Sequence, residues 1–263
     1  MRRRWPRPAI DMAFVLALVL ALPCAGEAAA ADRRSGSDFM APETRAMQAD
    51  DMSNPAMLWV ADGEQSWHRP EGAAGRACAT CHGDATRSMR GVAARYPAFA
   101  EATGRPVDLS GRINLCRRTH QPAPPFASES RELLALTAYV AYQSRGMPIA
   151  PPQDPRLDPF RANGGALYER RIGQLDLSCA ACHDARWGQQ LGGSVIPQAH
   201  PTAYPLYRLE WQSVGSLQRR LRNCMVGVRA EPYAFGAPEL VDLELFLMGR
   251  AGGMALETPG VRP

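Results

Sequence analysis

Hydrophobic residues recur at helical spacing in two long segments of the chain, 129–145 and 238–250. Their apolar positions are Leu133, Leu134, Leu136, Ala138, Tyr139 and Val140 in the first and Leu240, Leu243, Phe246 and Leu247 in the second. Such spacing predicts amphipathic helices. A further helix is expected over 160–172. Strand patterns are sparse, so the predicted fold class is all-α.

The first 31 residues carry a different hydrophobic pattern. Four arginines stand among the first seven residues, the apolar run 13–22 follows, and the small residues 28–31 come next. This order is typical of a secretory signal, and the run is too short to span a bilayer as an anchor. We therefore expect residues 1–31 to be a signal peptide and the mature chain to begin near Asp32 in the periplasm, with no membrane span.

Charge and proline content bound the remaining chain. Loss of the four arginines and two acids of the signal lowers the formal charge from +4 to +2, so nothing favours a nucleic acid or an anionic membrane as partner. The segment 146–155 is too rich in proline to continue a helix. It predicts a linker between two domains, 32–150 and 151–263, although a surface loop within one domain is the alternative.

Each predicted domain contains one Cys-x-x-Cys-His motif. The first runs from Cys78 through Cys81 to His82, and the second from Cys179 through Cys182 to His183. This spacing is typical of covalent haem c attachment, in which two thiols hold the haem vinyl groups and the imidazole binds iron. A zinc site from the two cysteine pairs or a thioredoxin-like redox motif would leave the histidine after each pair unexplained.

Two attached haems would give each domain an apolar core. The sequence therefore predicts two covalently bound haem c groups in two cytochrome c-like haem domains in tandem. The two halves also repeat in order, because a single later cysteine follows each motif. Arg112 stands four residues before Cys116, and Arg220 stands four residues before Cys224. If these segments are helical, each arginine lies on the same face as its cysteine.

The roles of Cys116 and Cys224 stay open on this reasoning alone. In an oxidising compartment they could form one disulfide with each other. Their matched positions favour the other interpretation, in which each thiolate is the distal ligand of its own domain's haem iron. Met147 and Met254 are the only competing ligands that also recur, and methionine ligation would indicate an ordinary electron carrier of higher potential.

Several segments together resemble the A subunit of the SoxAX cytochrome complex of bacterial sulfur oxidation. The resemblance rests on both haem motifs, on the Arg-x-x-x-Cys that follows each, on 220–225 and 257–262, and on 55–60 with the following Gly63. It covers nearly all of the predicted mature chain. The first haem motif, which some members lack, is intact here.

The resemblance implies an L-cysteine S-thiosulfotransferase that joins thiosulfate oxidatively to the C-terminal cysteine of a sulfur-carrier protein (SoxYZ-like). Its partner would be a small monohaem cytochrome, the SoxX-like subunit of a heterodimer, and two electrons would leave through the haems to a c-type cytochrome. By the same resemblance, Cys224 is the distal ligand of the second haem and the active sulfur, found in the family as a persulfide. Arg220 would hold the substrate, and Cys116 would ligate the first haem iron.

The residues around Cys224 agree with that role. Arginine suits a dianionic sulfur oxyanion because its planar fork binds two oxygens at once. Arg222, Arg229 and Arg250 are further candidates for a positive site, with a solvated helix face as the alternative for each. Two other function classes stay in view: a diheme cytochrome c that only transfers electrons, and a diheme peroxidase, which needs an open iron position.

Overall fold

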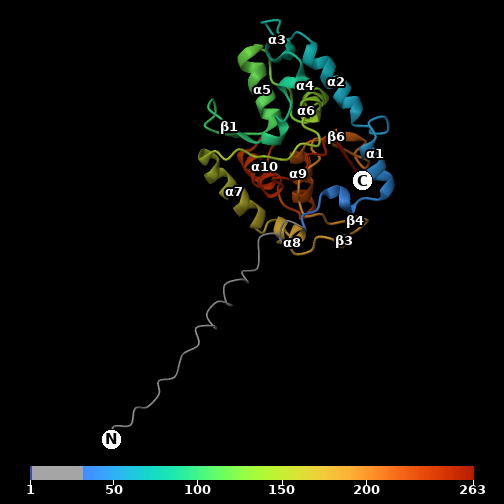
Figure 1. Ribbon diagram of the computed structural model, residues 1–263, viewed down its shortest axis with the longest axis vertical. Coiled ribbons are helices and arrows are strands. Elements are labelled where there is room, and N and C mark those ends of the chain that lie inside the picture. Colours follow the sequence, from blue (N-terminus) through green and yellow to red (C-terminus); the bar gives the residue numbers. More distant parts are fainter. Residues whose placement is uncertain (2–31) are drawn as a thin grey trace. The chain divides into compact units, whose positions relative to one another are not determined.

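The computed structural model describes residue 1 and residues 32–263, so all but Met1 of the predicted signal peptide lies outside the described residues. Residues 34–263 pack as one compact unit. Figure 1 shows the haem-motif helices α3 and α8 at opposite ends of this unit, with α6 and α10 between them. Within the described part of the chain, no helix is long and apolar enough to cross a membrane.

The unit contains ten α-helices among its described residues, joined by short strands and turns. The helices are α1 Pro42–Ala49, α2 Met57–His68, α3 Cys78–His82, α4 Ala85–Ser88, α5 Leu109–His120, α6 Arg131–Tyr142, α7 Asp158–Glu169, α8 Cys179–His183, α9 Leu217–Gly227 and α10 Pro238–Arg250. The strands are β1 Ala98–Ala100, β2 Arg105–Val107, β3 Gln190–Leu191, β4 Ser194–Val195, β5 Leu206–Arg208, β6 Ser213–Gly215 and β7 Gly260–Arg262. The three helices expected from hydrophobic spacing are present.

The same arrangement of helices occurs twice. In the first half α2 packs against α6, and in the second half α7 packs against α10. A glycine sits at each crossing: a Cβ on Gly63 would lie 2.2 Å from the carbonyl oxygen of Ala135, and one on Gly164 would lie 2.1 Å from that of Asp242. Because only glycine permits this close approach, the helices meet backbone to backbone. The structure thus repeats the order that the sequence motifs suggest.

The all-α prediction overlooks seven short strands among the described residues. β1 pairs with β2, and β3 pairs with β4, each antiparallel. β5 lies between β6, to which it is antiparallel, and β7, to which it is parallel. Strands of two or three residues are too short to display an alternating pattern, which needs at least four residues to be recognised. The fold is mainly helical, with small sheets that connect the cysteine helices to the rest of the unit.

The proline-rich stretch is docked rather than extended. Ile149 is 1% exposed, and the residues around it pair with the segment that follows α10. Four backbone hydrogen bonds join the two: Gly146 N to Leu256 O (2.8 Å), Leu256 N to Met147 O (2.9 Å), Ile149 N to Met254 O (2.8 Å) and Gly253 N to Ile149 O (2.7 Å). The ends of the two repeats therefore contact each other. The division into two haem domains at residue 150 stays a prediction.

Candidate haem and sulfur-binding site

The first haem motif forms the short helix α3. Its N-terminal residue Cys78 and the later Cys81 are one helical turn apart, so both thiols and the His82 imidazole reach the same cavity, which has a volume of about 430 Å³. Trp67 of α2 stands beside His82 with ring centroids 5.7 Å apart, and its indole Nε1 donates to the carbonyl oxygen of Gly83 at 3.0 Å. The donor set and the apolar wall fit a covalently attached haem.

The second motif forms the equivalent helix α8. Ser178 caps it, with the side chain accepting a hydrogen bond from the backbone N–H of Ala181. The Nδ1 atom of His183 lies 2.7 Å from the carbonyl oxygen of Pro197. That contact fixes the ring and leaves Nε2 to bind a metal, as the hydrogen-bond partners of metal-bound histidines do. His183 lines a cavity of about 320 Å³ whose lining also includes Cys224.

Cys116 lies on α5 and Cys224 on α9, and the helices predicted to carry them are present. Cys116 lines the cavity of the first motif, and Cys224 lines the cavity of His183. None of the six described cysteines forms a disulfide. Nor does any group of three or more His, Cys, Asp or Glu side chains gather as an ion site in the described part of the chain. Each of the two cavities is thus lined by one motif histidine and one later cysteine.

The two cysteines differ in their electrostatic surroundings. Burial raises the pKa of Cys116, and the Arg112 guanidinium only partly opposes this. Burial also acts to raise the pKa of Cys224, but contact with His183 and the positive charges of Arg220 and Arg208 outweigh it. The pKa of Cys224 therefore falls below its ordinary value. A thiolate is the nucleophilic form of cysteine, and the surroundings of Cys224 favour that form more than those of Cys116 do.

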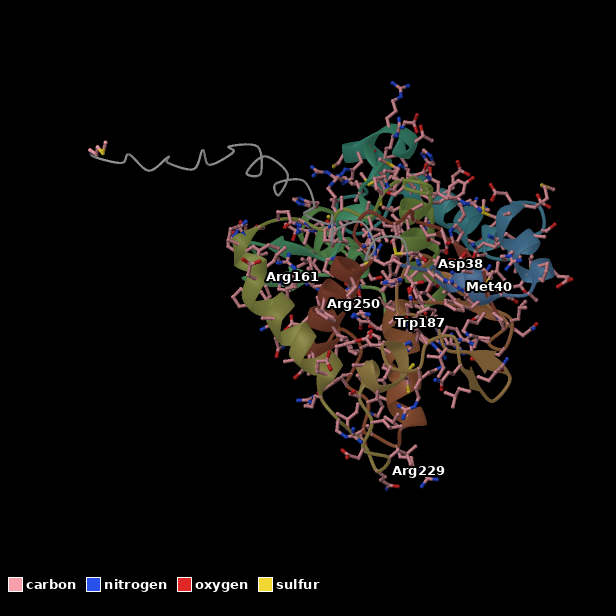
Figure 2. The ribbon with its side chains drawn as sticks, turned by 60° about the horizontal axis from the view of Figure 1, so that its bottom comes forward. Asp38, Met40, Arg161, Trp187, Arg229 and Arg250 are labelled. Carbon is pink, nitrogen blue, oxygen red and sulfur yellow. The ribbon has the colours of Figure 1, made fainter. Side chains whose placement is uncertain are left out.

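The candidate arginines separate into two groups. Arg220, one turn before Cys224 on α9, lines the Cys224 cavity as predicted. Arg250 instead donates to the carboxylate of Asp184 at 2.5 Å and lies 4.7 Å from the ring centroid of Tyr168. Arg222 stacks on Phe235 at 4.4 Å. Figure 2 shows Arg229 at the outer edge of the unit, apart from Arg250.

One charged residue of the Cys224 cavity, Arg208, belongs to none of the sequence motifs. Arg208, the last residue of β5, is 8% exposed and lines the cavity together with Arg220 and Cys224. Burial and the neighbouring charge of Arg220 lower the pKa of Arg208. No motif marks this residue, because its place depends on a three-residue strand far from either haem motif. The only available signal is an isolated arginine in an otherwise apolar segment.

Comparisons with known proteins agree on one family. A family model described as SoxA/TsdA, cytochrome c domain matches residues 62–149. The L-cysteine S-thiosulfotransferase subunit SoxA of Rhodovulum sulfidophilum is 36% identical over 229 residues, covering 87% of this chain and 80% of that protein. The chain belongs to the SoxA family. The SoxA subunit of Pseudaminobacter salicylatoxidans is 37% identical over 230 residues, with the same two shares covered.

A solved structure of the SoxA family has the same fold. The crystal structure of SoxXA from P. pantotrophus matches with a TM-score of 0.84 and 30% identity, covering 88% of this chain and 87% of that one. Membership of the SoxA family confirms the resemblance derived from the motifs. It also gives the chain a cytochrome c domain with covalently bound haem c.

Proposed function

We propose that this chain is the catalytic subunit of an L-cysteine S-thiosulfotransferase, which joins thiosulfate to a cysteine of a carrier protein. One observation carries the proposal: Cys224, with a pKa below its ordinary value, shares a cavity with Arg220 and with the histidine of a haem motif. The curated SoxA relatives carry the name of the same activity. A purely electron-transferring cytochrome would have no use for a buried arginine beside a reactive sulfur.

We infer two haems, one for each half of the chain. Cys78, Cys81, Cys179 and Cys182 would hold them covalently. His82 and Cys116 would be the axial ligands of the first iron, and His183 and Cys224 those of the second. Two separate cavities, each lined by a motif histidine and by the cysteine that follows that motif in the sequence, support this assignment. The domains 32–150 and 151–263 would then be two tandem haem domains. Electron paramagnetic resonance of the holoprotein should show two low-spin ferric species with thiolate ligation.

The chemistry follows from the residues of the second site. The haem, when bound, supplies an iron that accepts electrons one at a time. Arg220 holds the sulfonate end of thiosulfate by charge-assisted hydrogen bonds, which places the outer sulfur against Sγ of Cys224. The Cys224 thiolate and thiosulfate form a sulfur–sulfur bond and lose two electrons, which leave the protein to a cytochrome acceptor. The carrier thiolate then attacks the outer sulfur, takes the S–SO₃ group and releases the Cys224 thiolate.

The partners follow from the same proposal. We propose a heterodimer with a small monohaem cytochrome, a SoxX-like subunit, and support comes from the match to a crystal structure of SoxXA. The acceptor would be a SoxYZ-like carrier protein with a C-terminal cysteine, met in the periplasm after removal of residues 1–31. Arg250 would support the site indirectly, since it binds Asp184 next to His183.

The test uses the holoprotein with its small cytochrome partner, thiosulfate and a carrier thiol, with mass spectrometry of the carrier and reduction of a c-type cytochrome as readouts. Cys224→Ser should abolish the thiosulfate adduct while both haems stay attached. Arg220→Lys keeps the charge but loses the fork, and a charge-assisted hydrogen bond contributes about 1.5–3 kcal/mol, so kcat/KM should fall roughly ten- to a hundredfold.

The matched control is Arg219→Lys. Arg219 neighbours Arg220 on α9 but lies over the ring of Trp211 at 4.2 Å, so this variant should turn over at the wild-type rate. Adduct formation by Cys224→Ser at the wild-type rate would refute the proposal. Equal losses in Arg219→Lys and Arg220→Lys would remove the substrate-binding role of Arg220.

A further inference from the structure

The Cys224 cavity contains arginines in addition to His183 and Cys224, the two residues proposed as iron ligands. Arg208, Arg220 and Arg262 all line it, and no Asp or Glu side chain does so among the described residues. Arg262 is neutralised locally, because it pairs with Glu257 at 2.8 Å and also donates to Gln48. Arg208 has one half-exposed carboxylate near it, that of Glu210, and no ion pair joins Arg220 to an acid among the described residues.

The Nε atom of Arg208 is buried without a hydrogen bond. It is inaccessible to solvent and makes no hydrogen bond among the described residues. The nearest carboxylate, Glu210, lies 3.2 Å from Nε, but Glu210 is half exposed and so is well solvated. A buried N–H group left without an acceptor is costly. Nε of Arg112 in the first cavity is buried in the same way, so the second cavity is set apart by the two like charges, Arg208 and Arg220, that line it together. Two like charges in one cavity favour an anion between them.

The two repeats provide an internal comparison. The strands β1 and β5 occupy equivalent places, since each pairs with the strand that leads into a cysteine helix. Their last residues, Ala100 and Arg208, each stand sixteen residues before the cysteine of their own repeat. Arg112 and Arg220 are likewise equivalent. The first site thus has the arginine on its cysteine helix but alanine where the second site has Arg208.

Other arginines of the first cavity do not replace Arg208. Arg76 and Arg95 are exposed at its rim, and Arg117 is paired with Glu71. Arg117 is itself buried, but Glu71 pairs with it and its guanidinium lies over the ring of Phe126. The two cavities therefore differ in the arginine that accompanies the one on the cysteine helix.

We propose that Arg208 and Arg220 form a two-guanidinium clamp for the sulfonate end of thiosulfate, and that Arg208 makes the second site selective for a dianion. The inference rests on the proposed function, because it assigns a substrate to the same site. Two arginines can bind three sulfonate oxygens in planar, bidentate fashion. In the first site the buried arginine of the cavity, Arg117, is held by Glu71, so Arg112 has no equivalent partner among the described residues.

Arg208 and Arg220 could instead bind the carboxylate of a haem propionate. The experiment distinguishes this anion from thiosulfate. Sulfate, an inert dianion of the same shape, is titrated into the wild-type holoprotein complex by calorimetry, and the KM for thiosulfate is measured alongside. Arg208→Gln should raise both the sulfate Kd and the thiosulfate KM about ten- to a hundredfold, the loss expected for one charge-assisted contact. Arg208→Lys should raise both by a smaller factor.

Arg219→Gln is the matched control, since Arg219 and Arg208 both stack on Trp211, at 4.2 and 5.3 Å, while Arg219 does not line the cavity. It should bind sulfate as the wild type does. Wild-type sulfate affinity in Arg208→Gln, with a shifted potential of the second haem, would assign Arg208 to a propionate and overturn the clamp. If the wild-type complex binds sulfate in a way that depends on Arg208 but does not turn over thiosulfate, the proposed function is refuted and the clamp still stands.

Discussion

α7 crosses α10 and also contacts α8, the helix of the second cysteine motif, and a single methyl group should disturb this crossing. Gly164 lies where the two helices touch, and a Cβ there would be 2.1 Å from the Asp242 carbonyl oxygen and 2.8 Å from Cβ of Phe246. Ordinary contacts begin near 3.4 Å, so Gly164→Ala must push the helices apart by about 1.3 Å. The obstacle is backbone, which cannot rotate away.

The expected change in the free energy of unfolding of Gly164→Ala is the sum of two opposing effects. Overpacking costs about 1–3 kcal/mol, and the rigid carbonyl places this site at the upper end. Alanine gains about 0.8–1.0 kcal/mol over glycine in a helix. The net loss is therefore about 2 kcal/mol of unfolding free energy, which in a domain of this size lowers Tm by roughly 4–8 °C. The separation would also loosen Tyr168 and Leu243, which pack in the same cluster.

Thermal unfolding of the holoprotein, followed by circular dichroism, measures the effect. Gly249→Ala is the matched control, because Gly249 lies on α10 with nothing within 4 Å of its would-be Cβ. That variant should gain about 0.5–1 kcal/mol. Gly63→Ala, at the equivalent crossing of the first half, should behave like Gly164→Ala. A Tm for Gly164→Ala at or above the wild-type value, alongside a stabilised Gly249→Ala, would refute the close crossing.

Three further outcomes are expected. Burial and the charge of Asp108 raise the pKa of Glu244 well above its ordinary value. The stability this gives is present below the unfolded-state pKa and is lost as pH rises through the folded-state pKa, by about 1.4 kcal/mol for each pH unit that separates the two values. In urea titrations, Glu244→Gln should therefore lose less stability with rising pH than the wild type, and parallel curves would exclude Glu244 as the source. Cys116→Met should change the spectrum of the first haem and slow electron exit at most, whereas loss of all carrier adduct would mean that the reactive site is in the first half. Replacing Cys179 and Cys182 by alanine should leave the first haem spectrum unchanged, and loss of both spectra would argue for one undivided haem core.

The strongest helix and the placement of one later cysteine in the cavity of each motif histidine could be predicted from sequence because their signals are local. Pro238 begins α10 and Arg250 ends it, as the hydrophobic spacing indicates. Cys116 and Cys224 match by their order after each motif, and the structure places each in the cavity of its own motif. A residue's spacing from a motif is a property of the sequence itself, so no tertiary information is needed.

What could not be predicted depends on contacts between distant segments. Ile149 looks like part of a linker because proline content says nothing about what a segment packs against, yet it pairs with residues beyond α10. Arg208 looks like an ordinary surface cation, because only the pairing of β5 with β6 and β7 buries it. The charge of Arg250 suggests a place in the site, and its partner, the carboxylate of Asp184 in a distant segment, could not be predicted.

The paired ends of the repeats have the geometry of a symmetric dimer interface within one chain. The bond from Ile149 N to Met254 O is mirrored by that from Leu256 N to Met147 O, and the bond from Gly146 N to Leu256 O by that from Gly253 N to Ile149 O. Contacts of this reciprocal kind define an isologous interface. In a homodimer every substitution appears at both sites at once. Covalent linkage of the two copies lifts that restriction, so arginine can stand at 208 while alanine stays at 100, and each of the two cysteine cavities can change without the other.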